Sequence, residues 1–294
     1  MSVPTIAVFG ATGSQGGSVV HYLKSSGQYH VRALTRNPAR YDGPADEVVA
    51  ADLNDEQSLS QALEGVYGVF LVTNFWQEGT DEIAQAKAAI RAAKAAGVKH
   101  LVWSSLPDVA AISDGKWNVP HFTNKAQIDP IVREAGFPVH TIVQPAFYFE
   151  NLLGAMAASD LGDGTKGWAI PIDPNARVIH MGSVAQMGKL VERAFSTPEK
   201  SHGKTLSMAA GLYSFSDIIA AFNNAGKSYS VVQVTQETFA DLFLGAKEIG
   251  QMMGYFEDHT YMGPEANEHL AVAEQLNATP LTPLEQWVKT ALQA

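Results

Sequence analysis

A histidine and a lysine four residues apart, His121 and Lys125, are the first side chains in this sequence that suggest chemistry. Residues spaced by four lie on one face of a helix, so both side chains would project in the same direction. Histidine exchanges protons near neutral pH, which makes His121 a candidate catalytic residue beside a cation. The alternative is that His121 lines a cleft at the start of a helix and has no role in proton transfer.

A second motif consists of three glycines with three-residue spacing, Gly10, Gly13 and Gly16. An apolar run at 6–9 precedes them and a helical apolar stripe at 19–23 follows, which predicts a strand, a tight turn and a helix. Such turns bind a pyrophosphate through the N–H groups at the helix start, although this spacing fits the G-x-G-x-x-G fingerprint only loosely and also suits an ordinary turn. The predicted phosphate loop comprises Gly10, Ala11, Thr12, Gly13, Ser14, Gln15 and Gly16.

An arginine follows the second expected strand, residues 30–35. In dinucleotide-binding βαβ units the residue at this point reads the adenosine ribose, and arginine there accommodates the 2′-phosphate of NADP. Arg36, with Arg40 nearby, therefore favours NADP(H) over NAD(H), unless both are merely solvated loop residues. Asp52 and Leu53 end the third expected strand, which should bring them near the adenine.

The chain alternates expected strands and helices, which predicts a Rossmann-type, doubly wound parallel sheet. Strands at 66–73 and 100–105 would end at the ligand crevice, where Thr73, Asn74, Phe75, Trp76, Ser104 and Ser105 follow or close them. Residues 107–120 lose periodicity and predict an irregular loop over that crevice, and 121–136 read as one helix.

The second half reads as a smaller α+β lobe, so we expect a nucleotide-binding domain at 1–152 and a substrate or partner lobe at 153–294, intertwined with it. Residues 238–256 predict one long amphipathic helix. This lobe should cover the nicotinamide end of the crevice.

Composition excludes several classes of protein. The chain of 294 residues has no cysteine and a formal net charge of −10, which excludes disulfides and iron–sulfur clusters and argues against direct nucleic-acid binding. No histidine spacing suggests a metal site. The N-terminal residues lead directly into a strand without a signal-peptide pattern or a long apolar span, so we expect a cytoplasmic protein without membrane insertion, with nuclear entry open in a eukaryote.

Five motifs resemble the NmrA-like family, atypical relatives of the short-chain dehydrogenase/reductases, and within it the redox-sensing type that binds NADPH. The resemblance covers the whole chain and is strongest to about residue 155. It rests on the segments 10–16, 35–37, 72–76, 121–125 and 148–153. It implies that NADP(H) is surrounded by the glycine loop, Arg36, Asn37, Thr73, Asn74, Phe75, Lys125, Tyr148, Phe149, Glu150 and Asn151.

One departure from ordinary short-chain reductases matters for function. Their Tyr-x-x-x-Lys pair supplies a proton and holds the nicotinamide ribose, and here His121 takes the tyrosine position while Lys125 is kept. A second lysine that contacts the cofactor in the sensor type has no counterpart, because Lys87 is out of register with it.

Two functions follow as hypotheses. The first is an NADP(H)-binding sensor that acts through a regulatory protein partner. The alternative is an NADPH-dependent reductase of a small quinone, enone or carbonyl substrate, with His121 or a bound water as proton donor.

Overall fold

Seven parallel strands form the central sheet, and the computed structural model describes residues 3–293. They are β1 (Thr5–Val8), β2 (His30–Thr35), β3 (Glu47–Ala50), β4 (Gly68–Leu71), β5 (His100–Ser104), β6 (Val139–Gln144) and β11 (Thr205–Ser207). The order is β11-β6-β5-β4-β1-β2-β3, so it reverses between β1 and β4. Such a reversal leaves a crevice outside the carboxyl ends of the strands. The predicted Rossmann-type sheet is confirmed.

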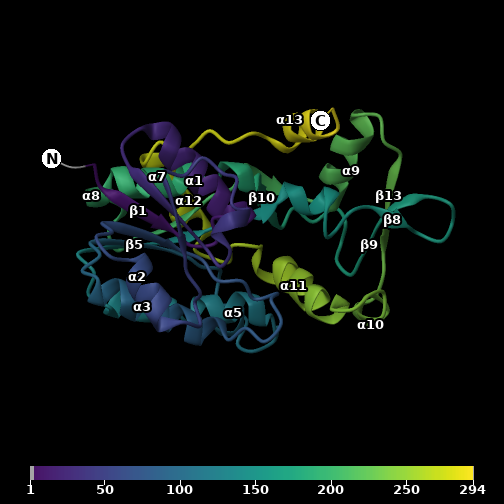
Figure 1. Cartoon of the computed structure of the whole chain (residues 1–294). Helices are drawn as coiled ribbons and strands as arrows, with labels where there is room; N and C mark the ends of the chain where they lie inside the picture. The colour runs from purple at the N-terminus through teal and green to yellow at the C-terminus, as the bar shows by residue number, and fades with distance from the viewer. Residues whose placement is uncertain (1–2, 294) are drawn as a thin grey trace.

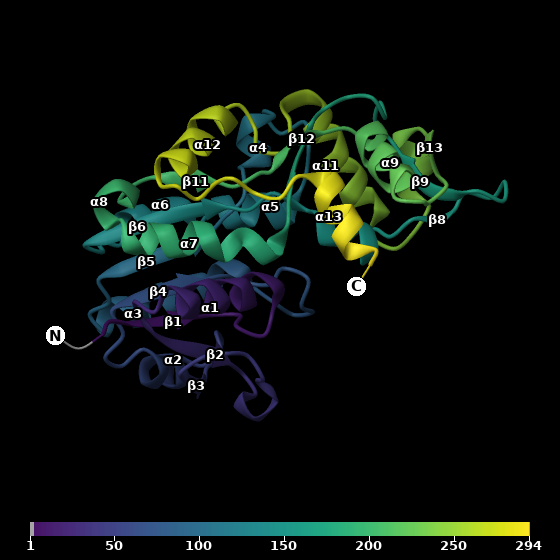
Figure 2. The ribbon, with the colours of Figure 1, turned by 90° about the horizontal axis from the view of Figure 1, so that it is seen from above.

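Helices cover both faces of this sheet, as Figures 1 and 2 show. One face carries α1 (Ser14–Ser26), α7 (Met187–Ser196) and α12 (Ala266–Gln275), and the other carries α2 (Glu56–Ala62), α3 (Glu82–Ala95) and α6 (Asp129–Glu134). The approach of α7 to α1 is close, since a Cβ on Gly188 would lie 2.1 Å from the Ser18 carbonyl oxygen. Each face therefore has its own apolar core.

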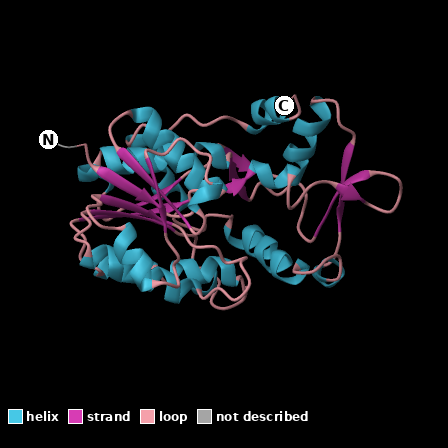
Figure 3. Ribbon diagram, in the orientation of Figure 1, coloured by secondary structure: helices cyan, strands magenta, loops and turns pink. Residues whose placement is uncertain are grey.

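The second half of the chain adds two three-stranded sheets, and β13 with its neighbours lies at the far right of Figure 3. Aromatic side chains, among them Trp168, Phe222 and Phe256, dominate the core there. Its strands are β7 (Phe147–Tyr148), β8 (Ser159–Asp160), β9 (Lys166–Ile170), β10 (Ile179–Gly182), β12 (Gly211–Tyr213) and β13 (Tyr229–Gln233). Its helices are α9 (Phe215–Asn224), α10 (Gln236–Ala240), α11 (Ala246–His259) and α13 (Leu284–Ala291).

Short helices complete the described residues: η1 (Pro38–Arg40), α4 (Val109–Ile112), α5 (Pro120–Ala126), η2 (Phe149–Leu153), η3 (Val184–Gln186) and α8 (Pro198–Ser201). The division of the chain at residue 152 stays a prediction. Beyond that point, α7, α8, α12, η3 and β11 pack into the layers around the main sheet, and the other elements form the smaller lobe.

Three sequence predictions of helices or loops are wrong in detail. The helix expected at 121–136 is two helices, α5 and α6, because Pro130 has no N–H to continue the ladder. The helix expected at 238–256 is also two, α10 and α11, separated by Gly245 with φ of +90°. The segment 107–120, expected to be irregular, contains α4.

Candidate functional site

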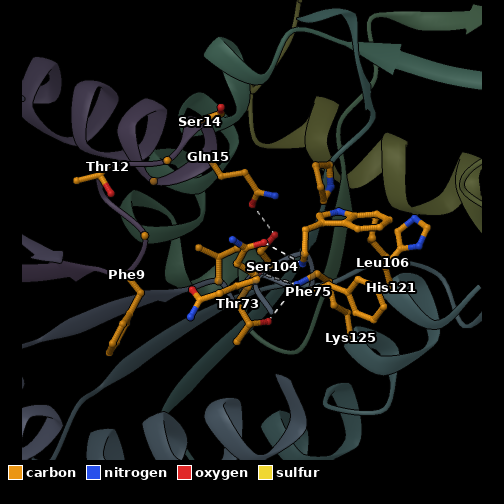
Figure 4. A pocket seen from close by; sticks show the side chains of 18 of the residues that line it. Phe9, Thr12, Ser14, Gln15, Thr73, Phe75, Ser104, Leu106, His121 and Lys125 are labelled. Carbon is orange, nitrogen blue, oxygen red and sulfur yellow. Dashed lines mark hydrogen bonds between the residues drawn. The ribbon is translucent and has the colours of Figure 1, made fainter. Parts of the chain in front are cut away.

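A cavity of about 960 Å³ opens at the carboxyl ends of β1, β2, β4 and β5 and continues under the smaller lobe. Figure 4 shows side chains from the glycine turn, from the ends of β4 and β5 and from α5 converging on it. Most of the predicted site residues line this one cavity. They are Gly10, Thr12, Gly13, Ser14, Gln15, Gly16, Arg36, Asn37, Arg40, Asp52, Leu53, Thr73, Asn74, Phe75, His121, Lys125, Tyr148 and Asn151.

Three predicted residues lie outside the lining. Ala11 is buried in the core beneath α1, and Phe149 is buried in the core of the smaller lobe. The Glu150 carboxylate accepts hydrogen bonds from the hydroxyl of Ser183, at 2.5 Å, and from the N–H of Val184, at 3.0 Å. Their side chains are thus engaged in packing or in local hydrogen bonds, and any contact with a cofactor stays a prediction.

The glycine turn has the geometry that each position requires. Gly10 adopts φ of +63°, in the left-handed region, so the chain leaves β1 sharply. A Cβ on Gly16 would lie 2.2 Å from the Gly10 carbonyl oxygen, so only glycine allows α1 to approach so closely. Gly13 caps α1 without a side-chain hydrogen bond, and no acidic residue stands in the first turn. The backbone N–H groups at the start of α1 are therefore available to an anion.

One end of the cavity, which we call the adenosine end, is defined by Arg36, Arg40 and Asp52. Both arginines are exposed, and the ion pairs among residues 3–293 involve other arginines. The Asp52 carboxylate accepts the N–H of Asn54 at 2.9 Å, and the Asn54 amide oxygen accepts from Gln85 at 3.1 Å. This end combines two unpaired guanidinium groups with a hydrogen-bonded polar floor.

The opposite end, which we call the reactive end, is defined by Lys125 and His121 on α5. Lys125 is buried, and its ammonium donates to Glu82 Oε1 at 2.7 Å and to the carbonyl and hydroxyl oxygens of Thr73, each at 3.0 Å. An ammonium has three N–H donors, so these three oxygens use all of them. Burial lowers the pKa of Lys125 below its usual value, and the carboxylate of Glu82 opposes that effect.

His121 is also buried, and its partner comes from the other half of the chain. Its Nδ1 lies 2.5 Å from Oε1 of Glu248, in the first turn of α11. The rings of Phe75 and Trp76 have centroids 5.8 and 5.0 Å from the imidazole, so the polar contact has aromatic walls. Burial acts to raise the pKa of Glu248, but the hydrogen bond and charge of His121 outweigh it, and the pKa lies below its usual value.

Two further groups on the cavity walls bear on ligand binding. The hydroxyl of Ser104 donates to the amide oxygen of Gln15 at 2.7 Å, which joins the start of α1 to the end of β5. Tyr148 has a buried hydroxyl that makes no hydrogen bond of normal geometry within residues 3–293. Burial raises its pKa, and the neighbouring Gln15 side chain opposes that effect. An unsatisfied buried hydroxyl beside a cavity indicates a polar ligand atom.

A partly buried acid supports the reactive end from behind. Asp129, at the start of α6, accepts the indole N–H of Trp103 at 3.0 Å, and that ring lies 5.6 Å from the Lys125 ammonium. Burial raises the pKa of Asp129 to about 7, although hydrogen bonds from Ser105 and Trp103 oppose this. A carboxyl group that ionises near neutral pH therefore lies behind the reactive end, outside the residues that line the cavity.

Sequence reasoning missed the two carboxylates that matter most, Glu82 and Glu248. Glu82 looks like an ordinary acidic residue in the first turn of an alanine-rich helix, and Glu248 is 127 positions from the histidine it contacts. No local pattern marks either one. Further lining residues that were not singled out are mostly apolar: Phe9, Leu34, Ala51, Leu106, Phe122, Pro145, Ala146, Phe147, Ala155, Met156, Ile249 and Tyr261.

Comparison with known proteins decides the family. The model of the NmrA-like family matches residues 3–288. The chain belongs to the NmrA-like family. The resemblance seen in its motifs is thereby confirmed over nearly the whole length.

NmrA-like relatives share both the sequence pattern and the fold. FrzB of Cladobotryum, an oxidoreductase with an NmrA-like family domain, is 32% identical, over 93% of this chain and 90% of FrzB. The solved structure of NmrA, a negative transcriptional regulator, superposes with a TM-score of 0.82 at 24% identity, covering 98% of this chain and 95% of NmrA. NmrA has also been solved with NAD and with NADP.

A solved enzyme shares the same fold. The Escherichia coli NADPH-dependent quinone oxidoreductase QOR2, in complex with NADPH, has a TM-score of 0.77 at 22% identity, covering 98% of this chain and 99% of that enzyme. At these identities the two solved structures establish the fold alone. The NmrA-like fold is thus found in a transcriptional regulator and in a reductase.

The described residues contain neither a group of metal ligands nor a membrane-spanning helix. Between residues 3 and 293, no three His, Cys, Asp or Glu side chains are grouped so as to hold a metal ion. None of the helices in that range is both long and apolar enough to cross a membrane.

Proposed function

We propose that this NmrA-like protein binds NADP(H) and uses it to reduce a small quinone, enone or carbonyl compound. One observation carries the proposal: a single cavity joins the guanidinium groups of Arg36 and Arg40 to the His121–Glu248 pair, past the uncapped start of α1. The two guanidinium groups are exposed and form no ion pair within residues 3–293. Along the cavity, a basic end is followed by an anion site and then by a group that can donate a proton. This order matches that of the 2′-phosphate, the pyrophosphate and the nicotinamide in NADPH. The relatives named as oxidoreductases support the same class of activity.

The residues present fit the cofactor. The free N–H groups of α1 suit a pyrophosphate, because the helix start carries partial positive charge and no acidic side chain. Arg36 and Arg40 would hold the 2′-phosphate, since guanidinium groups bind phosphate through several N–H donors at once. The buried hydroxyl of Tyr148 offers a hydrogen bond to the part of the cofactor nearer the reactive end.

The reactive end assigns different roles to its two basic residues. Bound NADPH supplies a hydride to the substrate. Lys125 has its three N–H donors engaged by Glu82 and Thr73, so it holds the end of β4 in place and keeps positive charge at the cavity wall. His121 has one ring nitrogen on Glu248 and the other without a partner in residues 3–293, so Nε2 is the group that can give a proton to a substrate oxygen.

The pairing of His121 with a carboxylate puts the reductase ahead of the sensor, whereas the sequence alone favoured the sensor. A histidine that only lined the cavity would need no anion beside it. Phe75 and Trp76 bring aromatic surface against the imidazole, which suits a planar, conjugated substrate.

Regulation through a protein partner is the second candidate, and one observation favours it. The loop between α10 and α11 exposes Leu242, Phe243 and Leu244, and Leu244 is fully exposed. This loop directly precedes the helix that carries Glu248, so a partner bound there would be close to the reactive end. In this reading the bound form of the cofactor alters the position of α11.

Purified protein, NADPH and a panel of quinones, enones and carbonyl compounds separate the two candidates. The reductase proposal predicts steady oxidation of NADPH that His121→Phe lowers by roughly a hundredfold, the usual range for loss of a general acid. His21→Phe, at an exposed histidine of α1, is the matched control and should keep full activity. Tight NADPH binding with no turnover of any acceptor would contradict the reductase and favour the sensor.

A further inference from the structure

One face of α11 is hydrogen-bonded to the segment just before α5. Lys116 and the indole N–H of Trp117 both donate to the Asp258 carboxylate, at 2.5 and 2.7 Å. The Trp117 ring lies on Gly254, where a Cβ would come within 2.3 Å of it. Two α11 residues nearer its start, Gln251 and Glu248, accept hydrogen bonds from Asn118 N–H and the His121 ring.

The spacing of these four contacts fixes the rotation of α11. Positions 248, 251, 254 and 258 are three or four residues apart, so they form one stripe along the helix. Gly254 has no side chain, and this lets the Trp117 indole contact the helix backbone at that position. These contacts therefore set the position of α11 against the segment 116–121 along the length of the helix. As a result, a helix from the second half of the chain holds the Glu248 carboxylate at the imidazole of His121.

The contact determines which nitrogen of His121 faces the cavity. Only Nδ1 meets Glu248, and the side chain of His121 is 9% exposed, so the ring has little room to turn over. The Phe75, Trp76 and Phe122 rings pack around it with centroids 5.0–5.8 Å away. A carboxylate accepts but does not donate, so in the neutral ring the hydrogen must reside on Nδ1 and the lone pair on Nε2.

We propose that Glu248 is the positioning residue for His121: it holds the hydrogen on Nδ1, so that Nε2 faces the substrate. The inference rests on the proposed reduction. In that reaction the substrate carbonyl receives a hydride, with its electron pair, from NADPH and a proton from Nε2 of the imidazolium. The ring is left neutral with its Nδ1 hydrogen on Glu248, and water returns the proton to Nε2 for the next turnover.

The test combines a spectroscopic readout with kinetics on three variants. In the apo protein, ¹⁵N–¹H correlation of the imidazole rings reports which nitrogen carries the hydrogen, and His121→Phe identifies the signal. The wild type should show the Nδ1–H form of the neutral ring. Glu248→Ala should shift that ring toward Nε2–H, while Glu248→Gln, which keeps an oxygen acceptor, should stay closer to the wild type.

Kinetics with NADPH and an active acceptor should follow the same order. Glu248→Ala is expected to lower kcat by roughly tenfold to a hundredfold, part of the 10²–10⁴-fold that a positioned acid contributes. Glu248→Gln should restore part of the loss, and the KM for NADPH should change by less than about threefold, because a positioning residue acts mainly on the chemical step. Glu274→Gln, an exposed position on α12, is the control.

The outcomes are distinguishable. The same neutral-ring form in the wild type and Glu248→Ala would overturn the positioning role, whatever the turnover. An unchanged kcat in Glu248→Ala would overturn it as well. If the ring responds as expected but no acceptor is reduced, the inference about the ring stands and the proposed reductase function fails.

Discussion

The two ends of the cavity are built on different principles. The adenosine end comes from one continuous stretch, residues 10–54, which contains α1, β2 and β3, and its charged groups, Arg36 and Arg40, are exposed. The reactive end combines α5 with a helix more than a hundred residues away, and its charged groups, Lys125 and His121, are buried against carboxylates. One end offers unpaired charge to a ligand, whereas the other keeps its charge within the protein.

The proposed function accounts for this difference. Recognition of a 2′-phosphate needs accessible guanidinium groups, whose desolvation cost is small until the ligand arrives. Proton transfer needs a fixed orientation, which buried hydrogen bonds and aromatic packing supply. We therefore expect substitutions at the adenosine end to change affinity with little effect on folding, and substitutions at the reactive end to change stability or turnover.

The largest effect should come from breaking the buried pair at the reactive end. Glu82→Gln leaves Lys125 buried without its counter-charge, and removal of one partner of a buried pair costs about 3–5 kcal/mol. Urea denaturation measures the loss. The double variant Glu82→Leu with Lys125→Met should recover most of it, because an apolar pair needs no compensation. If Glu82→Gln is as stable as the wild type, the reactive end does not depend on its buried ion pair for stability, and the two ends do not differ in that respect.

A change of cofactor preference should follow from Arg36→Glu. Loss of a charge-assisted contact with phosphate, about 1.5–3 kcal/mol, should weaken NADP(H) by roughly tenfold to more than a hundredfold. NAD(H) lacks that phosphate, so its affinity should change far less. Calorimetric titration of both cofactors checks this, and urea denaturation should show a stability change within about 0.5 kcal/mol. Equal losses for the two cofactors would mean that Arg36 does not read the phosphate.

The partly buried acid behind the reactive end, Asp129, should make stability depend on pH. The pKa of Asp129 is raised to about 7, so between about pH 4 and pH 7 the folded state keeps a proton that the unfolded state releases. Its contribution to the free energy of unfolding therefore falls as pH rises through that range. Relative to Asp129→Asn, the wild type should lose on the order of 2 kcal/mol between pH 5 and pH 8. A constant difference between the two proteins would contradict the assigned environment.

The smallest effect is expected from Arg40→Ala. An exposed guanidinium that shares a phosphate with a neighbour contributes about 0.2–1 kcal/mol, so NADP(H) affinity should fall by a few-fold at most. The fall should shrink further at high salt, because exposed charges are screened. A loss as large as that of Arg36→Glu would instead make Arg40 the principal phosphate ligand.

The sequence predicted that the residues of the adenosine end lie together, and they do line one cavity, because their determinants are local; their contact with a cofactor stays a prediction. The glycine turn, the second strand and Arg36 follow one another within about 30 residues, and each has a recognisable spacing. The alternation of expected strands and helices also predicted the parallel sheet, and the observed strand order is that of a Rossmann-type fold. Gly10 and Gly16 have the conformations and close approaches that their spacing implied.

The reactive end was only half readable. The spacing of His121 and Lys125 predicted that both line one cavity, but their carboxylates come from tertiary contacts that leave no local trace. The break between α10 and α11 was also missed, because apolar periodicity continues across it and Gly245 alone marks the turn. If the break is missed, α10 and α11 are taken for one long helix, and Glu248 is then placed in the middle of that helix instead of in its first turn.

We propose that one extended dinucleotide joins the two ends of the cavity. A crystal structure of the protein grown with NADP⁺ would show whether it does. We expect a 2′-phosphate at Arg36 and Arg40, a pyrophosphate at the start of α1, and a nicotinamide ring between Tyr148 and His121. A cavity that stays empty in crystals of well-folded protein at saturating NADP⁺, or a dinucleotide bound elsewhere, would contradict it.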